Sequence, residues 1–215
     1  MSSVETTAHF INIGGFTSLY RDCYQEFILK HPTWKTVLWT VKDVDRLVKE
    51  RGEDKYFYSL NTFINRYNFA KYLILAVYGG WYVDLDVTWR RTLDDLIKTK
   101  LAYRRSIPWE KRKDESYPKL FVPVRSFPRQ KEVDHKMNDD NILYAEKGVL
   151  FDLITFARNR KDVDTSKEYE PFGPISLSMW LHSRDDLPRK YMYEDEIQKY
   201  GSYCRHLNTT GWKLG

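Results

Sequence analysis

The amino-acid sequence predicts one α/β domain with a mainly parallel mixed central sheet flanked by helices. Short β-rich runs alternate with helical runs near the N-terminus, a pattern typical of parallel strands joined by helical crossovers. At 215 residues the chain is long enough for one substantial core. No internal repeat, low-complexity segment or clear linker divides it, so we expect a single domain over residues 1–215.

The composition is that of a globular protein with an unusual aromatic content. Hydrophobic residues make up 42% of the chain, charged residues 30% and aromatic residues 16%. The net charge of +5 and the pI near 9.0 suit an anionic ligand such as a nucleotide diphosphate. Because the basic residues are spread among acidic ones, nucleic acid is not indicated as a partner.

Three further observations concern the environment of the protein. No apolar run reaches the roughly 18 residues of a transmembrane helix, so we expect no membrane segment. The N-terminus, Met1 to Thr7, lacks the basic start and apolar core of a signal peptide. Cys23 and Cys204 lie far apart and match neither a disulfide framework nor a Cys-x-x-Cys site. We therefore expect a reducing, cytoplasmic location.

The first fifty residues show two strand patterns, each followed by a helical pattern. The first strand pattern runs into Gly14-Gly15, a pair that lets the backbone approach a ligand closely. Ser18 is the expected N-cap of the first helix, and Gly52 ends the second. The predicted strands are residues 8–13 and the second half of residues 31–40, and the predicted helices begin at Ser18 and at residue 42.

The clearest helical pattern in the chain covers residues 62–78. Apolar residues recur on one side at the helical spacing, and Asn68 and Lys71 fall away from this stripe. The polar side is either an ordinary solvated face or part of a cavity shared with the carboxylates that follow the helix. The apolar stripe comprises Phe63, Tyr67, Ala70, Ile74 and Val77, and the polar side also carries Asn61, Asn65 and Tyr72.

Two aspartates follow this helix. Gly79-Gly80 ends the helix, the apolar run 81–83 predicts a short strand, and Asp84 and Asp86 stand at its exit. Because residues i and i+2 of a strand point to the same side, the two carboxylates can converge. Like charges beside a buried run repel each other and are costly to desolvate unless a cation lies between them. Two carboxylates without a soft ligand suit Mg²⁺ or Mn²⁺, and a solvated loop without an ion is the alternative.

The second half of the chain carries weaker patterns and several candidate ligands. Residues 137–141 enter a predicted strand, where their amides and carboxylates bind sugar hydroxyls, hold a catalytic carboxylate, or form an ordinary turn. Gly173-Pro174 precedes a helix whose free N–H groups can receive an anion. The predicted elements here are a short helix at 92–96, an irregular loop at 103–118, strands at 120–124 and 142–145, and helices at 149–158 and 174–183.

Several segments, in the same order along the chain, resemble the motifs of the sugar-transferase family that carries an Asp-x-Asp motif. Residues 31–39 resemble its Asn-Pro-x-aromatic-x-x-x-Leu-Trp segment. Residues 71–86 are similar to its central Arg-Tyr-x-x-Leu-x-x-x-Gly-Gly-x-Tyr-x-Asp-x-Asp motif. Gly173-Pro174, and His206 with Trp212-Lys213, resemble its later segments. The family includes fungal initiating mannosyltransferases and capsular polysaccharide transferases, and the compact size also resembles an algal-virus transferase domain.

The resemblance implies a GT-A fold with a nucleotide-binding half at about 1–90 and an acceptor half at about 91–215. It implies metal-dependent transfer of a sugar from a nucleotide-diphosphate donor, with a UDP-sugar favoured, to a glycan or glycoprotein hydroxyl, with retention at the anomeric carbon. The implied cofactor is Mn²⁺ or Mg²⁺. By matching position, Asp84 and Asp86 are catalytic and hold the metal with His206 or Asn208. The implied substrate-binding residues are Ile11, Gly14, Gly15, Trp39, Asn68, Lys71, Asp84, Asn138, Gly173, Trp212 and Lys213.

Two positions depart from the family pattern. Asn68 stands where the family usually has Asp, and Lys71 stands where it has Arg. Asn keeps hydrogen bonding without the charge, and Lys loses the bidentate fork, so the identity of the donor sugar stays open. Asp139 or Asp140 is the candidate for the group that faces the anomeric carbon. A non-catalytic carbohydrate-binding or assembly module is the alternative function, and a viral protein would act in the host cytoplasm.

Overall fold

The structure is a computed structural model that describes residues 6–12, 15–98, 120–125, 137–138, 141–160, 171–184, 189–193 and 203–207. Its strands are β1 (Thr7–Asn12), β2 (Lys35–Thr40), β3 (Gly80–Val83), β4 (Val87–Trp89), β5 (Leu120–Arg125), β6 (Met137–Asn138), β7 (Ile142–Ala145), β8 (Arg189–Tyr193) and β9 (Cys204–His206). Its helices are α1 (Ser18–Lys30), α2 (Val41–Glu50), α3 (Asp54–Ser59), α4 (Phe63–Tyr78), α6 (Phe151–Asn159) and α7 (Pro174–His182), with a further helical segment at 93–98.

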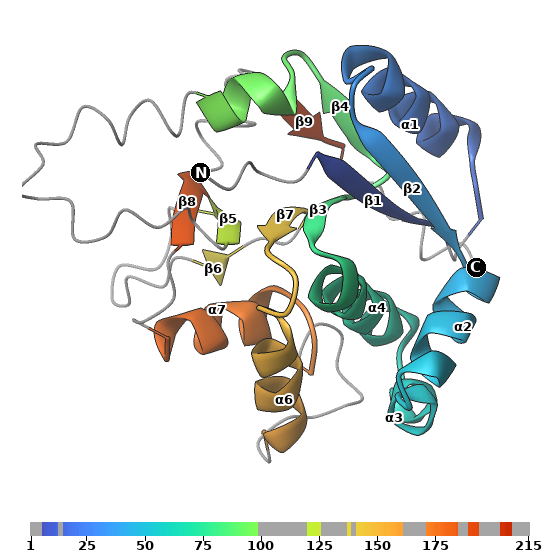
Figure 1. The fold of residues 1–215 in the computed structure, drawn as a ribbon, viewed down its shortest axis with the longest axis vertical. Helices are drawn as coiled ribbons and strands as arrows, with labels where there is room; N and C mark the ends of the chain where they lie inside the picture. Colours follow the sequence, from blue (N-terminus) through green and yellow to red (C-terminus); the bar gives the residue numbers. More distant parts are fainter. Residues whose placement is uncertain are drawn as a thin grey trace, which may run out of the picture.

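A mixed sheet forms the centre of the described part of the chain (Figure 1). Its strands are ordered β2-β1-β3-β7-β5-β6, with β8 beside β5, while β4 and β9 pair separately. The pairs β1–β2, β1–β3 and β5–β8 are parallel, and β7 runs antiparallel to both β3 and β5, as β6 does to β5. The predicted α/β class is therefore confirmed, and the parallel strands β2, β1 and β3 form its N-terminal half.

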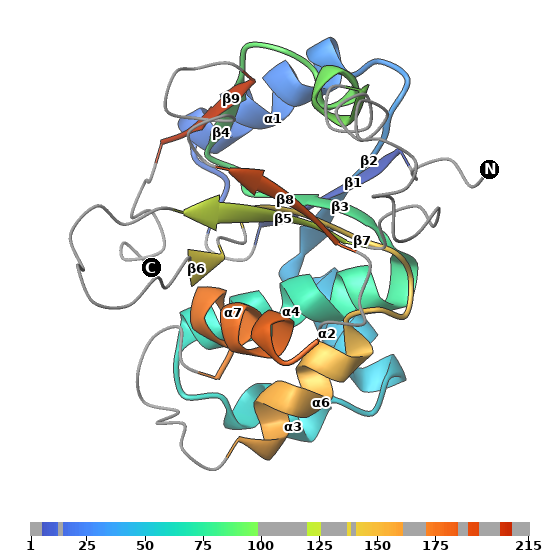
Figure 2. The same ribbon diagram turned by 90° about the vertical axis from the view of Figure 1, so that its left-hand side faces the viewer.

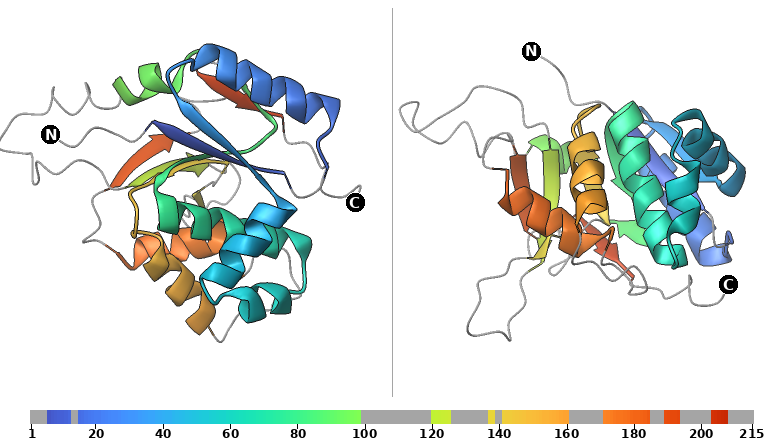
Figure 3. Two further views of the ribbon diagram at one scale, coloured as in Figure 1. Left: turned by 45° about the vertical axis from the view of Figure 1, so that its right-hand side comes forward. Right: turned by 90° about the horizontal axis from the view of Figure 1, so that it is seen from below.

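Helices cover both faces of the sheet (Figure 2). One face carries α4, α6 and α7 together with α2 and α3, and the opposite face carries α1, the segment at 93–98 and the β4–β9 pair. Seen from below, α7, α6, α4 and then α3 with α2 follow one another across the first face (Figure 3). The chain therefore has three layers, and the sheet separates two apolar cores.

Strand alternation divides the core residues between these two faces. In β3, Tyr82 packs toward the α4 side, whereas Trp81 and Val83 pack toward the α1 side. In β7, Leu143 and Ala145 face the α4 side in the same way. All four residues of each strand are buried, as expected for central strands covered on both faces.

Glycine is required at position 80, where the connection from α4 to β3 passes close to β1. Gly79 ends α4 with φ +71°, and Gly80 begins β3 with φ +95°. A Cβ at Gly80 would lie 2.7 Å from the carbonyl oxygen of Thr7 in β1. The carbonyl of Gly79 accepts a hydrogen bond from His9 Nε2 at 3.0 Å. Only glycine fits position 80 without displacing β1.

The observed elements differ from the predicted ones in several places. Thr17, and not Ser18, caps α1, because the Thr17 hydroxyl accepts the N–H of Tyr20. The polar side of α4 is not solvated, since Asn68 and Lys71 are each only 2% exposed. The helix α3 and the short strands β4, β6, β8 and β9 were not predicted. The predicted loop at 103–118 lies outside the described residues.

None of the helices formed by the described residues is both long enough and apolar enough to cross a membrane.

Candidate metal centre

The turn between β3 and β4 places two carboxylates at one edge of the sheet. The N–H of Val87 donates to the carbonyl of Asp84 at 3.3 Å, which closes the turn. The N–H of Asp84 donates to the carbonyl of Asn141 at 2.8 Å, and the N–H of Leu207 donates to the carbonyl of Asp86 at 2.9 Å. The start of β7 and the end of β9 therefore hold the turn from both sides. The two aspartates converge across this turn and not along one continuous strand.

His206 joins the two aspartates from the C-terminal strand β9. Its Nε2 lies 2.9 Å from Asp86 Oδ1 and 3.7 Å from Asp84 Oδ2. One ligand atom from each of the three residues lies within 4.8 Å of the other two. The pairing of His206 with Val87 across β9 and β4 sets this position. Two carboxylate oxygens and one imidazole nitrogen at this spacing fit a divalent cation.

The electrostatic environment of Asp84 also favours a cation. Burial raises the pKa of Asp84 to about 6, although the positive charges of Lys71 and His206 lower it. Lys71 Nζ lies 4.0 Å from Asp84 Oδ1. The ionised carboxylate is therefore costly in this position, and a bound cation removes part of that cost. The donor set and its charge both fit Mn²⁺ or Mg²⁺.

Two tyrosine hydroxyls lie against the same carboxylate. Tyr82 donates its hydroxyl to Asp84 Oδ1 at 2.5 Å, and the hydroxyl of Tyr67 hydrogen-bonds to that of Tyr82. Burial, followed by the charge of Asp84, raises the pKa of Tyr82 well above its usual value, so this phenol stays protonated and donates. Neither tyrosine was predicted to belong to the site. The available signal was that Tyr82 stands two residues before Asp84, on the same side of an extended chain.

Asn68 contacts the start of α7. Its Nδ2 donates to the carbonyl of Phe172 at 3.2 Å, and Phe172 immediately precedes Gly173, the N-cap of α7. The polar side of α4 is therefore buried, because Asn68 connects α4 to the segment before α7 while Lys71 reaches Asp84. The structure brings Lys71 to the metal centre and Asn68 to the Gly173 segment.

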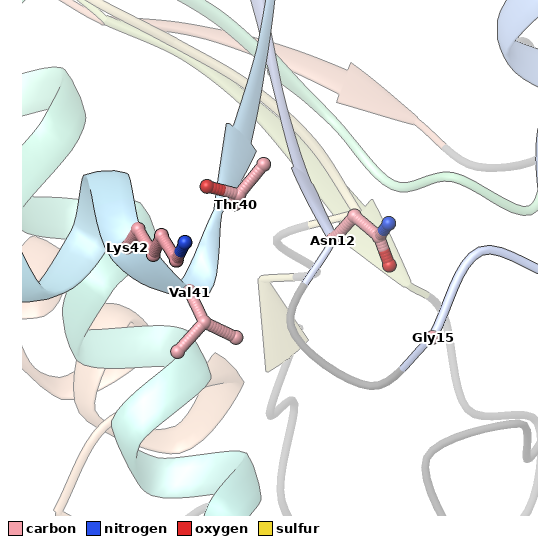
Figure 4. A pocket seen from close by; sticks show the side chains of 5 residues that line it. All are labelled: Asn12, Gly15, Thr40, Val41 and Lys42. Atoms are coloured by element: carbon pink, nitrogen blue, oxygen red, sulfur yellow. The ribbon is translucent and has the colours of Figure 1, made fainter.

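A cavity of about 400 Å³ lies where β1 and β2 end (Figure 4). Residues from both strand ends and from the first turn of α2 line it. Since β1, β2 and β3 are parallel, this cavity and the aspartate turn lie at the same edge of the sheet, where open α/β sheets bind ligands. The lining residues are Asn12, Gly15, Thr40, Val41 and Lys42.

The predicted nucleotide contacts Ile11 and Trp39 have buried side chains beside this cavity. Ile11 is 1% exposed, and Trp39 donates its indole Nε1 to His9 Nδ1 at 3.1 Å. These side chains support the ends of β1 and β2, and a direct contact with a nucleotide stays a prediction. Of the predicted residues on β1 and the loop that follows it, Gly15 lines the cavity.

Some predicted site residues lie outside the part of the chain that the structure describes, and only the backbone of Asn138 is described. The residues outside are Gly14, Asp139, Asp140, Asn208, Trp212 and Lys213.

Comparison with known proteins supports the resemblance seen in the sequence. Residues 18–102 match the family described as the glycosyltransferase sugar-binding region containing a DXD motif. The mannosyl phosphorylinositol ceramide synthase CSH1 of Saccharomyces cerevisiae is 36% identical over 90 residues, which are 39% of this chain and 23% of that protein. The inositol phosphoceramide mannosyltransferase 3 of Schizosaccharomyces pombe is 34% identical over 110 residues, which are 46% of this chain and 30% of that protein. The matches span less than a third of these relatives.

Solved structures share the fold at low sequence identity. The PaToxG glycosyltransferase aligns with a TM-score of 0.55 and 12% identity over 85% of this chain and 70% of its own. A glycosyltransferase involved in glycosylation of the major capsid of PBCV-1 aligns with a TM-score of 0.48 and 9% identity over 96% and 95% of the two chains. The match of residues 18–102 supports the resemblance to the Asp-x-Asp sugar-transferase family, and the alignment with the PaToxG glycosyltransferase confirms the GT-A fold.

Proposed function

We propose, from the match of residues 18–102 to the DXD glycosyltransferase family, that this protein transfers a sugar from a nucleotide-diphosphate donor to a hydroxyl group. The observation that carries the proposal is the convergence of Asp84, Asp86 and His206 inside 4.8 Å. The first two belong to the matched segment, and the cavity at the ends of β1 and β2 lies at the same sheet edge. A cation centre beside a cavity suits a ligand with a diphosphate and a base.

The residues of the site have distinct roles in this reaction. Asp84, Asp86 and His206 would hold the divalent ion, which as a Lewis acid stabilises the negative charge that develops on the leaving nucleoside diphosphate. Asp86, which is 7% exposed, supplies a carboxylate shielded from water. The buried network around Asp84 fixes the direction of that carboxylate. Since the leaving group needs charge stabilisation, no protein acid is required to protonate it.

The finer features of the reaction are part of the proposal. We propose that the cofactor is Mn²⁺, with Mg²⁺ as the alternative, and that the donor carries UDP. We also propose that transfer retains the configuration at the anomeric carbon. The curated relatives are named for mannosyl transfer to inositol phosphoceramide, which adds GDP-mannose to the donors and an inositol-containing glycolipid to the glycan and glycoprotein acceptors worth testing. A viral source and a cytoplasmic location also stay predictions.

Several residues outside the described part of the chain keep their proposed roles. Asp139 or Asp140 would face the anomeric carbon, Asn208 would be a further metal ligand, and Trp212 with Lys213 would contact the diphosphate. Asn208, Trp212 and Lys213 all follow His206 closely in the chain, which supports a position near the centre.

Donor hydrolysis tests the proposal. A panel of UDP- and GDP-sugars is incubated with Mn²⁺, Mg²⁺ or EDTA, and release of the nucleoside diphosphate is measured. We expect one donor to be hydrolysed with Mn²⁺ and spared with EDTA, and the Asp86→Ala variant to lose this activity. The matched control is Asp152→Ala, which removes an exposed carboxylate paired with Arg184 on the helical side.

If the Asp86→Ala variant still hydrolyses the donor in a Mn²⁺-dependent way, the assignment of Asp86 as a metal ligand of a sugar transferase is wrong. Binding calorimetry distinguishes a transferase from the alternative, a non-catalytic carbohydrate-binding module. Such a module should bind a free glycan without the nucleotide and without Mn²⁺.

A further inference from the structure

Asp84 uses its two carboxylate oxygens differently. Oδ1 accepts a hydrogen bond from the hydroxyl of Tyr82 at 2.5 Å and a longer one from the hydroxyl of Tyr67 at 3.5 Å. It also lies 4.0 Å from Lys71 Nζ. Oδ2 has a different neighbour, since it lies 3.7 Å from His206 Nε2. Oδ1 is therefore hydrogen-bonded to buried side chains of the protein, and Oδ2 faces the candidate metal site beside His206.

The interior side of this contact is built from two layers of the fold. Tyr82 comes from β3 and is fully buried, while Tyr67 comes from α4 and is partly buried. The hydroxyls of the two residues hydrogen-bond to each other, and their rings meet edge to face. A rotation of the Asp84 carboxylate would break the bond to a phenol that has no access to water.

Lys71 holds the two rings in place from the side of α4. Its ammonium nitrogen lies 4.6 Å from the ring centre of Tyr82 and 5.6 Å from that of Tyr67. A buried cation on two aromatic faces resists displacement, because moving either ring weakens a cation–π contact to the ammonium group of a lysine that is only 2% exposed. The tyrosine pair is thereby held against both α4 and Asp84.

We propose that Tyr82 is a positioning residue that fixes Asp84 with Oδ2 directed at the cation, and that Tyr67 acts through Tyr82. Because Tyr82 is completely buried, its hydroxyl acts on Asp84 and not on a substrate. The consequence for catalysis rests on the proposed function, whereas the consequence for metal binding does not. Partners that orient metal ligands typically change metal affinity by 10- to 100-fold when removed.

Direct Mn²⁺ binding tests the proposal without any nucleotide or sugar. The Kd is measured from the free Mn²⁺ signal in an electron paramagnetic resonance titration of the full chain. We expect Tyr82→Phe to weaken binding about 10-fold, and Tyr67→Phe to weaken it by a smaller factor. In the Tyr82→Phe background, Tyr67→Phe should have almost no further effect, because a residue that acts through another is non-additive with it.

The matched control is Tyr56→Phe. Tyr56 packs on Phe69 of α4 in the same apolar core, and its removal changes one phenol without touching Asp84. We expect this variant to bind Mn²⁺ like the unmodified protein. Thermal unfolding of every variant accompanies the titrations, and Tyr67→Phe, the less buried of the two changes, provides the test if Tyr82→Phe does not fold.

An unchanged Mn²⁺ affinity in Tyr82→Phe, or in Tyr67→Phe where Tyr82→Phe does not fold, overturns the proposal. Equal effects of Tyr67→Phe in the two backgrounds overturn its second part. A protein that binds Mn²⁺ with the expected tyrosine dependence and hydrolyses no nucleotide sugar would contradict the proposed function and leave the positioning role intact.

Discussion

At the scale of single residues, two ionisable side chains, Asp84 and His9, lie where desolvation disfavours their charged forms. Asp84 is partly buried next to Asp86, and desolvation raises its pKa to about 6. His9 of β1 is buried against the end of α4, and burial lowers its pKa to about 4. Each group makes a different process depend on pH. Asp84 should control metal binding, and His9 should control stability.

Mn²⁺ affinity should fall as the pH drops below about 6. The cation needs the ionised carboxylate, so protons compete with it once the pH is below the pKa of Asp84. We expect the apparent Kd to rise by up to about tenfold per pH unit below that value. Titrations between pH 5 and 8 check this, with Asp84→Asn as the variant that should lack the step. Equal affinities at pH 5 and pH 7 would contradict it.

His9 should make the free energy of unfolding fall on acidification, whereas the raised pKa of Asp84 acts in the opposite direction over the same pH range. His9 donates Nε2–H to the Gly79 carbonyl and accepts the Trp39 indole at Nδ1, so a second proton has no acceptor there. With a folded pKa of about 4 and an unfolded value of 6.5, the unfolded state binds more protons between these values. The stabilisation is full above about pH 6.5 and is lost progressively toward pH 4.

Between pH 7 and pH 5 the loss attributable to His9 should be about 2 kcal/mol. The difference between the unmodified protein and His9→Gln in urea unfolding at the two pH values measures it, since glutamine does not titrate and the contribution of Asp84 is common to both. His31 has a lowered pKa through burial and adds in the same direction, so the variant should keep part of the dependence. If His9→Gln keeps all of it, His9 is not the responsible group.

At the scale of elements, the connection from α4 to β3 determines where the aspartate turn begins. Gly80 packs its Cα against the Thr7 carbonyl of β1 and has φ +95°. Gly52, after α2, also has positive φ, at +67°, but no atom lies within 4 Å of the position a Cβ would take. The two glycines therefore separate the cost of the backbone conformation from the cost of a clash.

Gly80→Ala should lower the free energy of unfolding by about 2–4 kcal/mol, since it adds a backbone clash to a left-handed conformation. Gly52→Ala should cost only about 1 kcal/mol, from the conformation alone. Denaturant unfolding with a common slope measures both. Similar losses for the two variants would show that the contact with Thr7 is not a constraint.

The predictability of the fold follows the length of its elements. The 16-residue α4 shows its helical periodicity locally, and the central strands β3 and β7 are short apolar runs, so the sequence predicted them within a residue or two. The strand β4 has three residues, and its partner β9 lies more than a hundred residues away, so neither carries a readable local pattern.

The residues of the site were likewise easier to predict where the signal lies within a short stretch of the sequence. Asp84 and Asp86 are two residues apart, so the sequence predicted that their carboxylates can converge, although a turn and not a continuous strand brings them together. The sequence did not decide whether the polar face of α4 meets solvent or a cavity. The hydrogen-bond acceptor of Asn68 is the backbone carbonyl of Phe172, which lies 104 residues further along the chain. Tyr82 was interpreted as part of an apolar run and of the family motif, and its position two residues before Asp84 was a signal for the contact of its hydroxyl with that carboxylate.

At the scale of the whole molecule, the candidate metal centre joins distant parts of the chain. The β3–β4 turn, the residue before β7 and the last described strand meet there, through the backbone bonds of Asp84 with Asn141 and of Asp86 with Leu207. The β4–β9 pair lies on the α1 side of the sheet, next to the second apolar core (Figure 2). A cation held between Asp84, Asp86 and His206 would therefore bind β9 to the rest of the fold.

Mn²⁺ should for this reason stabilise the whole protein, since the unfolded chain does not bring residues 84, 86 and 206 together. At a free concentration 100 times the Kd, the gain should be about 2.7 kcal/mol, visible as a raised Tm that EDTA reverses. His206→Ala should lose most of the Mn²⁺-dependent increase, because it removes the only ligand of the trio that comes from β9. His182→Ala, which removes an exposed histidine at the end of α7, should keep it in full. An equal increase in both variants would place the cation elsewhere.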